Sequence, residues 1–199
     1  MIAKDSGGGS FEQAPTGTHV ARCYKLIDLG TTEQEFQGEV KKRHQIIVGW
    51  ELPNELMQTG EFAGQPFTAS KFYTLSLHEK ANLRHDLKNW RGRDFTDAEL
   101  KGFNLKNLLG ATCLLSVTTN EKGRADVSGV MALPKGSQVP EAVNPSTYFS
   151  FSEFDQGTFD GFSEKMQALI AKADEYKALN GQPTTAATEE QYTDASVPF

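Results

Sequence analysis

The 199-residue sequence has only two cysteines and no long hydrophobic run. Cys23 and Cys113 lie far apart within apolar, strand-like patterns and belong to no CxxC pair, so we expect two buried thiols. No segment approaches the ~18 apolar residues of a membrane-spanning helix, and the start, MIAKDSGGGS, lacks the apolar region of a secretion signal. These absences predict a cytoplasmic protein that does not associate with membranes.

Motifs of the common enzyme classes are also missing. There is no GxxxxGK[ST], no GxGxxG after a strand and no HExxH. The four histidines show no metal-ligand spacing with either cysteine, and the acidic residues form no DxD or paired-carboxylate cluster. We therefore predict no catalytic residues, no metal site and no cofactor, and a protein that is not an enzyme.

Charge is distributed unevenly along a chain whose net charge is −6. Residues 1–140 carry +1 and residues 141–199 carry −7. The segment from Lys71 to Arg93 alone carries +4. The acidic total argues against a simple nucleic-acid binder, but a local basic face combined with an acidic tail remains compatible with one.

Hydrophobic periodicity predicts a mainly β protein with added helices. The expected strands are Thr18–Leu29, Lys41–Leu52, Pro66–Leu77, Ala111–Thr119 and Arg124–Leu133, with a further extended segment around Tyr148 to Phe154. Capping boxes at Ser76–Glu79 and Thr96–Glu99 predict helices ending near Trp90 and Phe103, and Phe159–Leu179 is the longest helix candidate. Residues 31–40 are expected to form a polar loop.

This order of elements predicts a five-stranded, OB-like barrel, with a helical insertion between strands three and four and a C-terminal helix. The expected boundaries are a flexible arm at 1–17, the OB-like domain at 18–155, the helix at 156–180 and a disordered acidic tail at 181–199.

The basic and aromatic residues suggest a protein that binds single-stranded DNA. Such a protein needs cations along a groove and aromatic faces on which bases stack, at ~1–3 kcal/mol per base. The candidate phosphate contacts are Lys41, Lys42, Arg43, Lys71, Arg84, Lys88, Arg91 and Arg93, and the candidate stacking residues are Trp50 and Phe72. Alternatively, the helical basic stripe is a solvated surface, Phe72 packs under the helix, and Trp50, which shares a face with Ile46 and Val48, belongs to the core.

The C-terminal tail carries Glu189, Glu190 and Asp194 and ends in Val197-Pro198-Phe199. It resembles the acidic tip of bacterial single-stranded DNA-binding proteins, which ends in Pro-Phe, although the acids here are sparse and none adjoins the last three residues. A flexible anion can compete with DNA for a basic groove, and a terminal aromatic with its carboxylate can dock into a partner. We expect Asp194, Val197, Pro198 and Phe199 to bind replication or recombination proteins.

Residues 14–154 resemble a family of tailed-phage proteins from replication and recombination modules. The resemblance rests on YTLSLHEKANLRHDLKNWRGRDFTDAEL, PTGTHVARCYKLIDLG, LLGATCLLSV and MALPKG. It implies an OB-like, DNA-binding role in the host cytoplasm. The expected function is therefore sequence-independent binding of single-stranded DNA, with homo-oligomers possible. The alternatives are a phage protein-interaction or structural protein and a DNA-annealing or recombination mediator.

Overall fold

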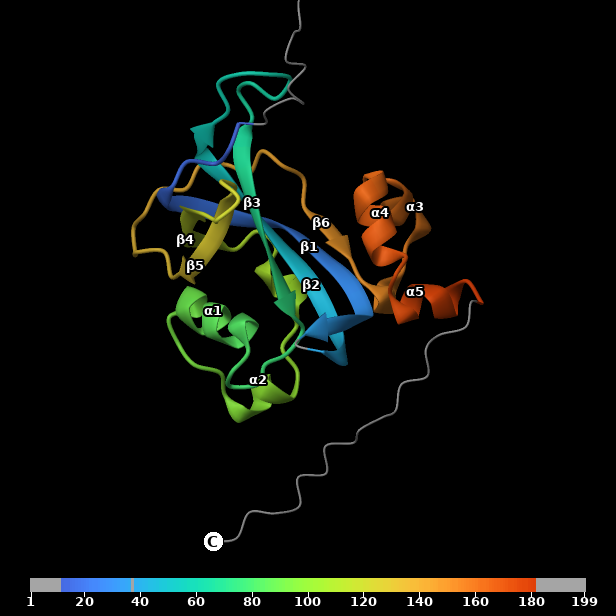
Figure 1. Cartoon of the computed structure of the whole chain (residues 1–199). Helices are drawn as coiled ribbons and strands as arrows, with labels where there is room; N and C mark the ends of the chain where they lie inside the picture. The colour runs from blue at the N-terminus through green and yellow to red at the C-terminus, as the bar shows by residue number, and fades with distance from the viewer. Residues whose placement is uncertain (1–11, 37, 182–199) are drawn as a thin grey trace, which may run out of the picture.

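A mixed β-sheet dominates the computed structural model, which describes residues 12–36 and 38–181 (Figure 1). Its strands are β1 (Gly17–Phe36), β2 (Glu39–Leu56), β3 (Pro66–Thr74), β4 (Thr112–Thr119), β5 (Ala125–Met131) and β6 (Thr147–Phe149). Hydrogen-bonded neighbours follow the order β3-β2-β1-β4-β5 and are antiparallel, while β6 pairs with β1 in parallel. The prediction of a mainly β fold with added helices is confirmed.

The helices are short and lie in two groups. They are α1 (Asn82–Arg91), α2 (Asp97–Lys101), α3 (Gln156–Asp160), α4 (Glu164–Ile170) and α5 (Asp174–Leu179), with 3₁₀ turns at Leu105–Leu108 and Phe151–Glu153. Figure 1 shows α1 and α2 at one end of the sheet, while α3, α4 and α5 gather beside β1 and β6. Within the described ranges, no helix is long and apolar enough to cross a membrane.

The sheet does not close into the predicted barrel, and it has six strands rather than five. Strands β3 and β5 are its two edges, and they approach each other without forming a ladder. Helix α1 packs against both edges. The chain leaving β5 bonds to this helix, because the Ala132 amide donates to the Asn89 carbonyl at 2.9 Å. After β5 the backbone therefore bonds to α1, and β3 and β5 do not form the ladder that would close a barrel.

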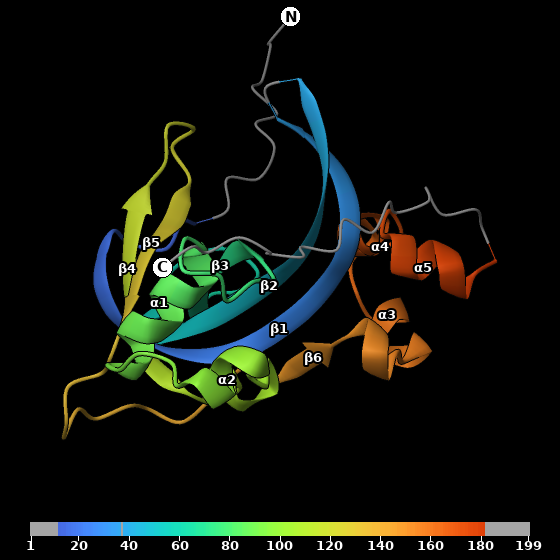
Figure 2. The ribbon, with the colours of Figure 1, turned by 90° about the horizontal axis from the view of Figure 1, so that it is seen from below.

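Strands β1 and β2 form a long hairpin where a polar loop was expected. The ladder continues through Glu33↔Lys42, a pair of opposite charges, and Gln34↔Lys41. Figure 2 shows β1 as one curved strand, with the β1–β2 hairpin at one end and the β4–β5 hairpin at the other, both pointing the same way. The polar residues 31–35 therefore belong to a hairpin strand and not to a loop.

Two hydrophobic cores lie on opposite sides of this curved sheet. The inner core contains Trp50 and Trp90, whose ring centroids are 5.8 Å apart. The outer core joins Ile27 and Ile47 of the sheet to phenylalanines and to Ile170 of the C-terminal helices. The alternation of β2 therefore buries both faces, with even-numbered residues inward and Ile47 outward.

The helix boundaries depend on local capping. The predicted Thr96–Glu99 capping box is present and begins α2. The box predicted at Ser76–Glu79 is wrong, because the Ser76 hydroxyl accepts a hydrogen bond from the His78 amide in a turn, and α1 begins only at Asn82. The helix ends as expected at Gly92, whose φ of 66° is left-handed.

The single C-terminal helix predicted at 156–180 is also wrong, since three short helices occupy this segment. Ser163 restarts the helical backbone by accepting a hydrogen bond from the Met166 amide, and the extended Ala173 restarts it again. Apolar side chains from all three helices still reach the outer core. The helical spacing of apolar residues therefore continues along the segment, although the helical backbone is interrupted before α4 and before α5.

The predicted N-terminal arm is partly packed. Ala14 is buried in the inner core, and the Glu12 carboxylate accepts hydrogen bonds from the Gln58 and Thr59 amides of the β2–β3 loop. The flexible-arm prediction is therefore wrong for residues 12–17. Residues 1–11 and 182–199 lie outside the described ranges.

Candidate nucleic-acid interface

The basic stripe of α1 is engaged by two acidic residues that follow the helix. Lys88 donates to Asp94 at 2.7 Å, and Arg84 lies 3.7 Å from the same carboxylate. Arg93 binds Glu99 at 2.8 Å. Hydrogen bonds from Lys88 lower the pKa of Asp94, and those from Arg93 lower the pKa of Glu99 to about 2. The stripe is therefore a compensated surface rather than the free cationic face that the sequence suggested.

Arg91 has a packing role. Its guanidinium lies 4.5 Å from the Phe95 ring centroid and 5.0 Å from that of Phe103, and it also pairs with Glu99. Only 13% of its side chain is exposed. A cation held between two rings and a carboxylate joins α1 to α2 and has little surface left for a phosphate.

Two other candidates also point toward the interior. Trp50 is 1% exposed in the inner core, so its indole offers no face to a base, as the core alternative proposed. Lys71 points inward and donates to Asp86 at 2.8 Å, and the Tyr73 hydroxyl donates to the same carboxylate oxygen at 2.8 Å. Burial, reinforced by Asp86, raises the pKa of Tyr73, which keeps this hydroxyl a donor. These three side chains fasten β3 to α1.

The basic run at the start of β2 divides into paired and open residues. Lys41 pairs with Glu39 at 2.6 Å, and Lys42 pairs with Asp174 of α5 at 2.8 Å. Arg43 is exposed and forms no ion pair within residues 12–36 and 38–181. Of the three, Arg43 retains the most accessible charge.

Phe72 stands on the outer side of β3, at the end of an apolar row across the sheet. It pairs with Ile47, which pairs with Ile27, and the two isoleucines are covered by the C-terminal helices. Phe72 is not covered: 53% of it is exposed. It lines a cavity of about 410 Å³ with Leu169 and Lys172 of the C-terminal segment. The expectation of an exposed aromatic on β3 is confirmed, and the alternative of packing under α1 is wrong.

The next row of paired residues across the sheet contains Lys25, which the sequence analysis did not propose as a site residue. Lys25 of β1 pairs with Gly49, which pairs with Ser70 of β3. A side chain at Gly49 would meet the Lys25 stem at 3.0 Å, so the lysine lies flat over the glycine. A register shift between Cys23 and Lys25 makes Tyr24 an extra residue, and the Lys25 ammonium lies 5.1 Å from its ring. A bulge inside a regular strand pattern leaves no clear signal in the sequence.

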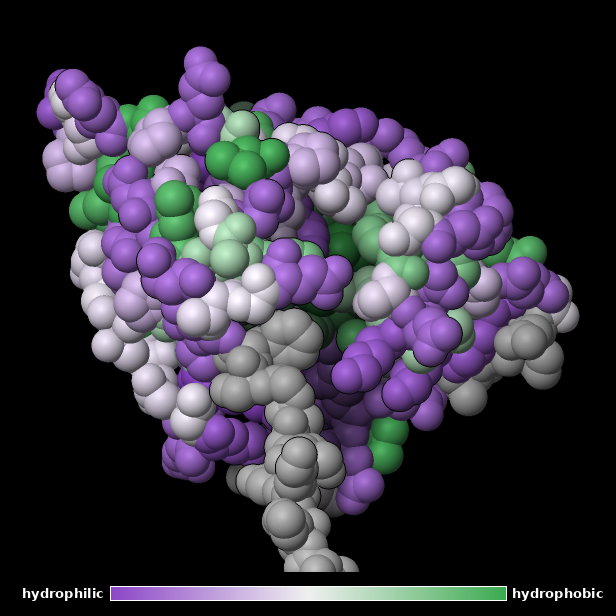
Figure 3. Space-filling view, turned by 90° about the horizontal axis from the view of Figure 1, so that it is seen from above, coloured by the Kyte–Doolittle hydropathy of each residue, from purple (hydrophilic) through white to green (hydrophobic). Residues whose placement is uncertain are grey.

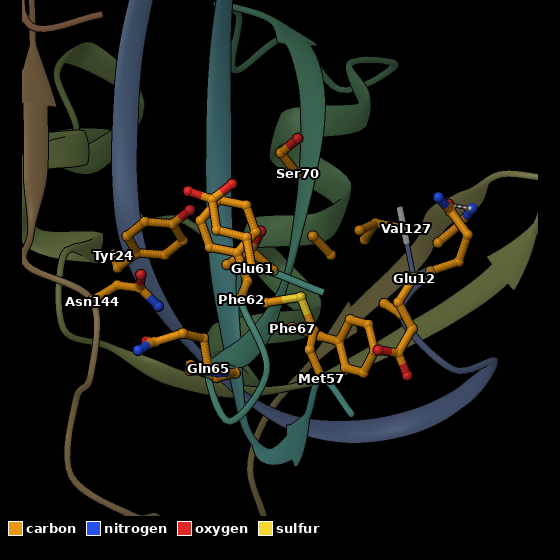
Figure 4. Close-up of a pocket in the computed structure, with 16 residues that line it drawn as sticks. Glu12, Tyr24, Met57, Glu61, Phe62, Gln65, Phe67, Ser70, Val127 and Asn144 are labelled. Atoms are coloured by element: carbon orange, nitrogen blue, oxygen red, sulfur yellow. Dashed lines mark hydrogen bonds between the residues drawn. The ribbon is translucent and has the colours of Figure 1, made fainter. Parts of the chain in front are cut away.

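A larger cavity of about 750 Å³ lies at the β2–β3 loop and extends from Tyr24 to Phe67 and Val127 of the inner core. Figure 4 shows Tyr24 and Asn144 on one side of it, Glu12 and Val127 on the other, and Phe62 of the loop between them. Phe62 is 48% exposed. The sequence analysis placed Phe62 in a loop without assigning it a role.

We call the outer surface of β1, β2 and β3, together with the β2–β3 loop, the open face. It carries the side chains Tyr24, Lys25, Phe62 and Phe72, and the exposed Arg43 lies further along β2. Figure 3 shows the surface hollowed between the sheet and the C-terminal helices, with hydrophobic atoms deep in the hollow. Aromatic rings with cations among them can stack flat ligands and attract anions.

No protein-family model matches the chain, and no curated protein is significantly similar to it. Among the described residues, no group of three or more His, Cys, Asp or Glu side chains could hold a metal ion. The predicted partner-binding residues Asp194, Val197, Pro198 and Phe199 lie outside the described ranges, so that expectation stays a prediction.

Proposed function

We propose that this protein binds single-stranded DNA on the open face and carries out no chemistry on it. The observation that carries the proposal is that two exposed aromatic residues, Phe62 and Phe72, and the half-buried Tyr24 accompany Lys25 on the open face, with the exposed Arg43 further along β2. Bases stack on such rings whatever their sequence, while the lysine and arginine attract phosphates. The basic stripe of α1 has no part in this site.

The strand order supports the same proposal. OB folds are partly open five-stranded barrels that bind oligonucleotides on the face of strands 2 and 3. Here the order is β3-β2-β1-β4-β5, and α1 lies between β3 and β4 in the chain. We infer an OB-type sheet opened between β3 and β5. The β2–β3 surface on which such folds bind their ligands is then the open face.

The resemblance to tailed-phage replication and recombination proteins adds a biological setting. In that setting the protein covers single strands in the host cytoplasm, and residues 194–199 recruit replication or recombination partners. Deleting residues 182–199 should leave DNA binding intact or tighter, because the tail carries a net negative charge that competes with DNA.

Fluorescence anisotropy tests the proposal. A labelled single strand of about 30 nucleotides and its duplex are titrated at two salt concentrations, with the tail present and deleted. Phe72→Ala should weaken single-strand binding by about 5- to 150-fold, the range of ~1–3 kcal/mol for one stacked base. Leu179→Ala is the matched control, because Leu179 is similarly exposed, at 56%, but stands at the end of α5. Equal affinity for both DNA forms, or equal binding by the two variants, would contradict the proposal.

A further inference from the structure

The large cavity at the β2–β3 loop differs in charge from the rest of the open face. Glu12 and Glu61 line it, and no lysine, arginine or histidine is among the described residues around it. A phosphate would approach two carboxylates with no cation in the wall, which is unfavourable. The cavity therefore suits an uncharged base better than a phosphate of the DNA backbone.

The cavity also offers fixed hydrogen-bond acceptors. The buried Glu51 carboxylate accepts hydrogen bonds from the Asn144 amide at 2.8 Å and from Asn144 Nδ2 at 2.9 Å. This bond uses one of the two N–H groups of Nδ2, so Asn144 can present its carbonyl oxygen and one N–H to a ligand. The exposed Glu61 carboxylate adds two further acceptor oxygens. Gln65, Thr68 and Ser70 of the same wall can donate as well as accept. Glu61 is therefore the lining carboxylate that can only accept and that forms no hydrogen bond within the described residues, because Glu12 is engaged with the loop amides.

Ring faces complete the site. Tyr24 and Phe62 line the same cavity as Glu61 and Asn144 (Figure 4). Glu12 anchors the loop that carries Phe62, since its carboxylate accepts hydrogen bonds from the Gln58 and Thr59 amides at 2.8 and 3.2 Å. A flat ligand can stack here while its edge meets the acceptors.

We propose that this cavity holds one unstacked nucleobase and favours bases that carry an amino group over thymine. Cytosine and adenine present an exocyclic amino donor, and a carboxylate is a suitable acceptor for cytosine N4. Thymine carries the O4 acceptor where cytosine carries its N4 amino group, so at that position it offers the Glu61 carboxylate no donor. The inference rests on the proposed function, and it adds a base preference to binding that is otherwise independent of sequence.

Competition between two pyrimidine homopolymers tests this inference. Oligo-dC and oligo-dT of about 30 nucleotides differ in the donor at position 4 but stack similarly. The wild-type protein should bind oligo-dC about fivefold tighter, equivalent to ~1 kcal/mol. Glu61→Gln should reduce this ratio to about one, because a carboxamide can donate to thymine as well as accept from cytosine.

Glu79→Gln is the control, since it removes the same charge from an exposed residue that does not line the cavity. It should leave the dC/dT ratio unchanged. Tight binding of both homopolymers with equal affinity would overturn the base preference and leave the proposed function standing. An unchanged ratio in Glu61→Gln would also overturn it. Failure to bind either homopolymer would overturn the proposed function, and the base preference with it.

Discussion

Replacing Asp86 should destabilise the protein, because this residue of α1 holds two side chains of β3. The Asp86 side chain is 8% exposed, and one carboxylate oxygen accepts hydrogen bonds from both Lys71 and Tyr73. Asp86→Ala removes an acceptor from a tyrosine that is 3% exposed and a counter-charge from a lysine whose side chain is 21% exposed. It also releases the helix that occupies the opening between β3 and β5.

The expected loss follows from these two groups. An unsatisfied buried hydroxyl costs ~1–3 kcal/mol. Breaking a fully buried ion pair costs ~3–5 kcal/mol, and the partial exposure of Lys71 places its share well below that range. We therefore expect Asp86→Ala to lower the free energy of unfolding by about 3 kcal/mol. Asp86→Asn keeps an acceptor for Tyr73, and it should lose about half as much.

Urea unfolding followed by tryptophan fluorescence measures this directly. The two tryptophans, Trp50 and Trp90, pack against each other, and Trp90 stands one turn after Asp86 on α1. An Asp86→Ala protein within about 0.5 kcal/mol of the wild type would refute the reasoning. A loss in Asp86→Asn equal to that in Asp86→Ala would show that the charge, and not the Tyr73 hydrogen bond, dominates.

Three further predictions follow from other contacts. The hydrogen bond to Asp28 raises the pKa of His44 in the folded protein. The stabilisation that the protonated His44 provides is therefore present below about pH 6.5 and is lost as the pH rises through the raised pKa of the folded state. The Tm difference between wild type and His44→Gln should shrink with rising pH, and a constant difference would contradict this. Gly30→Ala should lower the free energy of unfolding by roughly 1–3 kcal/mol more than Gly136→Ala. Both glycines have positive φ, but only at Gly30 would a Cβ lie 2.6 Å from the Ala173 Cβ of the C-terminal segment. Equal losses in the two variants would show that the close contact between Gly30 and Ala173 is unimportant. Burial raises the pKa of Cys23 to about 12 and also raises that of Cys113, so neither thiol should react with Ellman's reagent in the native protein at about pH 8, and both should react in denaturant.

Local patterns predicted much of the sheet. Alternation placed Ile46, Val48 and Trp50 on one inward face, as the structure confirms. The turn at residues 120–123 was recognisable from its asparagine and glycine, and the Gly123 amide donates to the Asn120 carbonyl at 2.9 Å. Both features depend on residues close together in the sequence, so the sequence was sufficient to predict them.

The errors arise where distant segments meet. The open edge between β3 and β5 depends on how α1 packs, and hydrophobic pattern does not encode that packing. The division of 156–180 into three helices depends on Ser163 and on the extended Ala173, while the apolar period runs on unchanged. Propensity alone does not decide such breaks.

The candidate site was only partly predictable. Phe72 and Arg43 could be found from strand alternation and composition. The ion pairs of Asp94 and Glu99 with the basic residues of α1 and Arg93 could not be predicted, because they depend on how the chain folds back toward the helix after Gly92. Tyr24 and Lys25 share the open face because of a bulge whose position depends on pairing with β2. The proposed interface therefore lies on the sheet and not on the helix.

Paired charge reversals test that relocation most directly. Lys25→Glu alters the open face beside Tyr24, whereas Lys88→Glu makes the same change on α1 next to Asp94. Single-strand affinity, measured by anisotropy at low salt, should fall at least about tenfold in Lys25→Glu and change less than about twofold in Lys88→Glu. The reverse order, with Lys88→Glu the more damaging, would contradict the assignment and return the interface to α1.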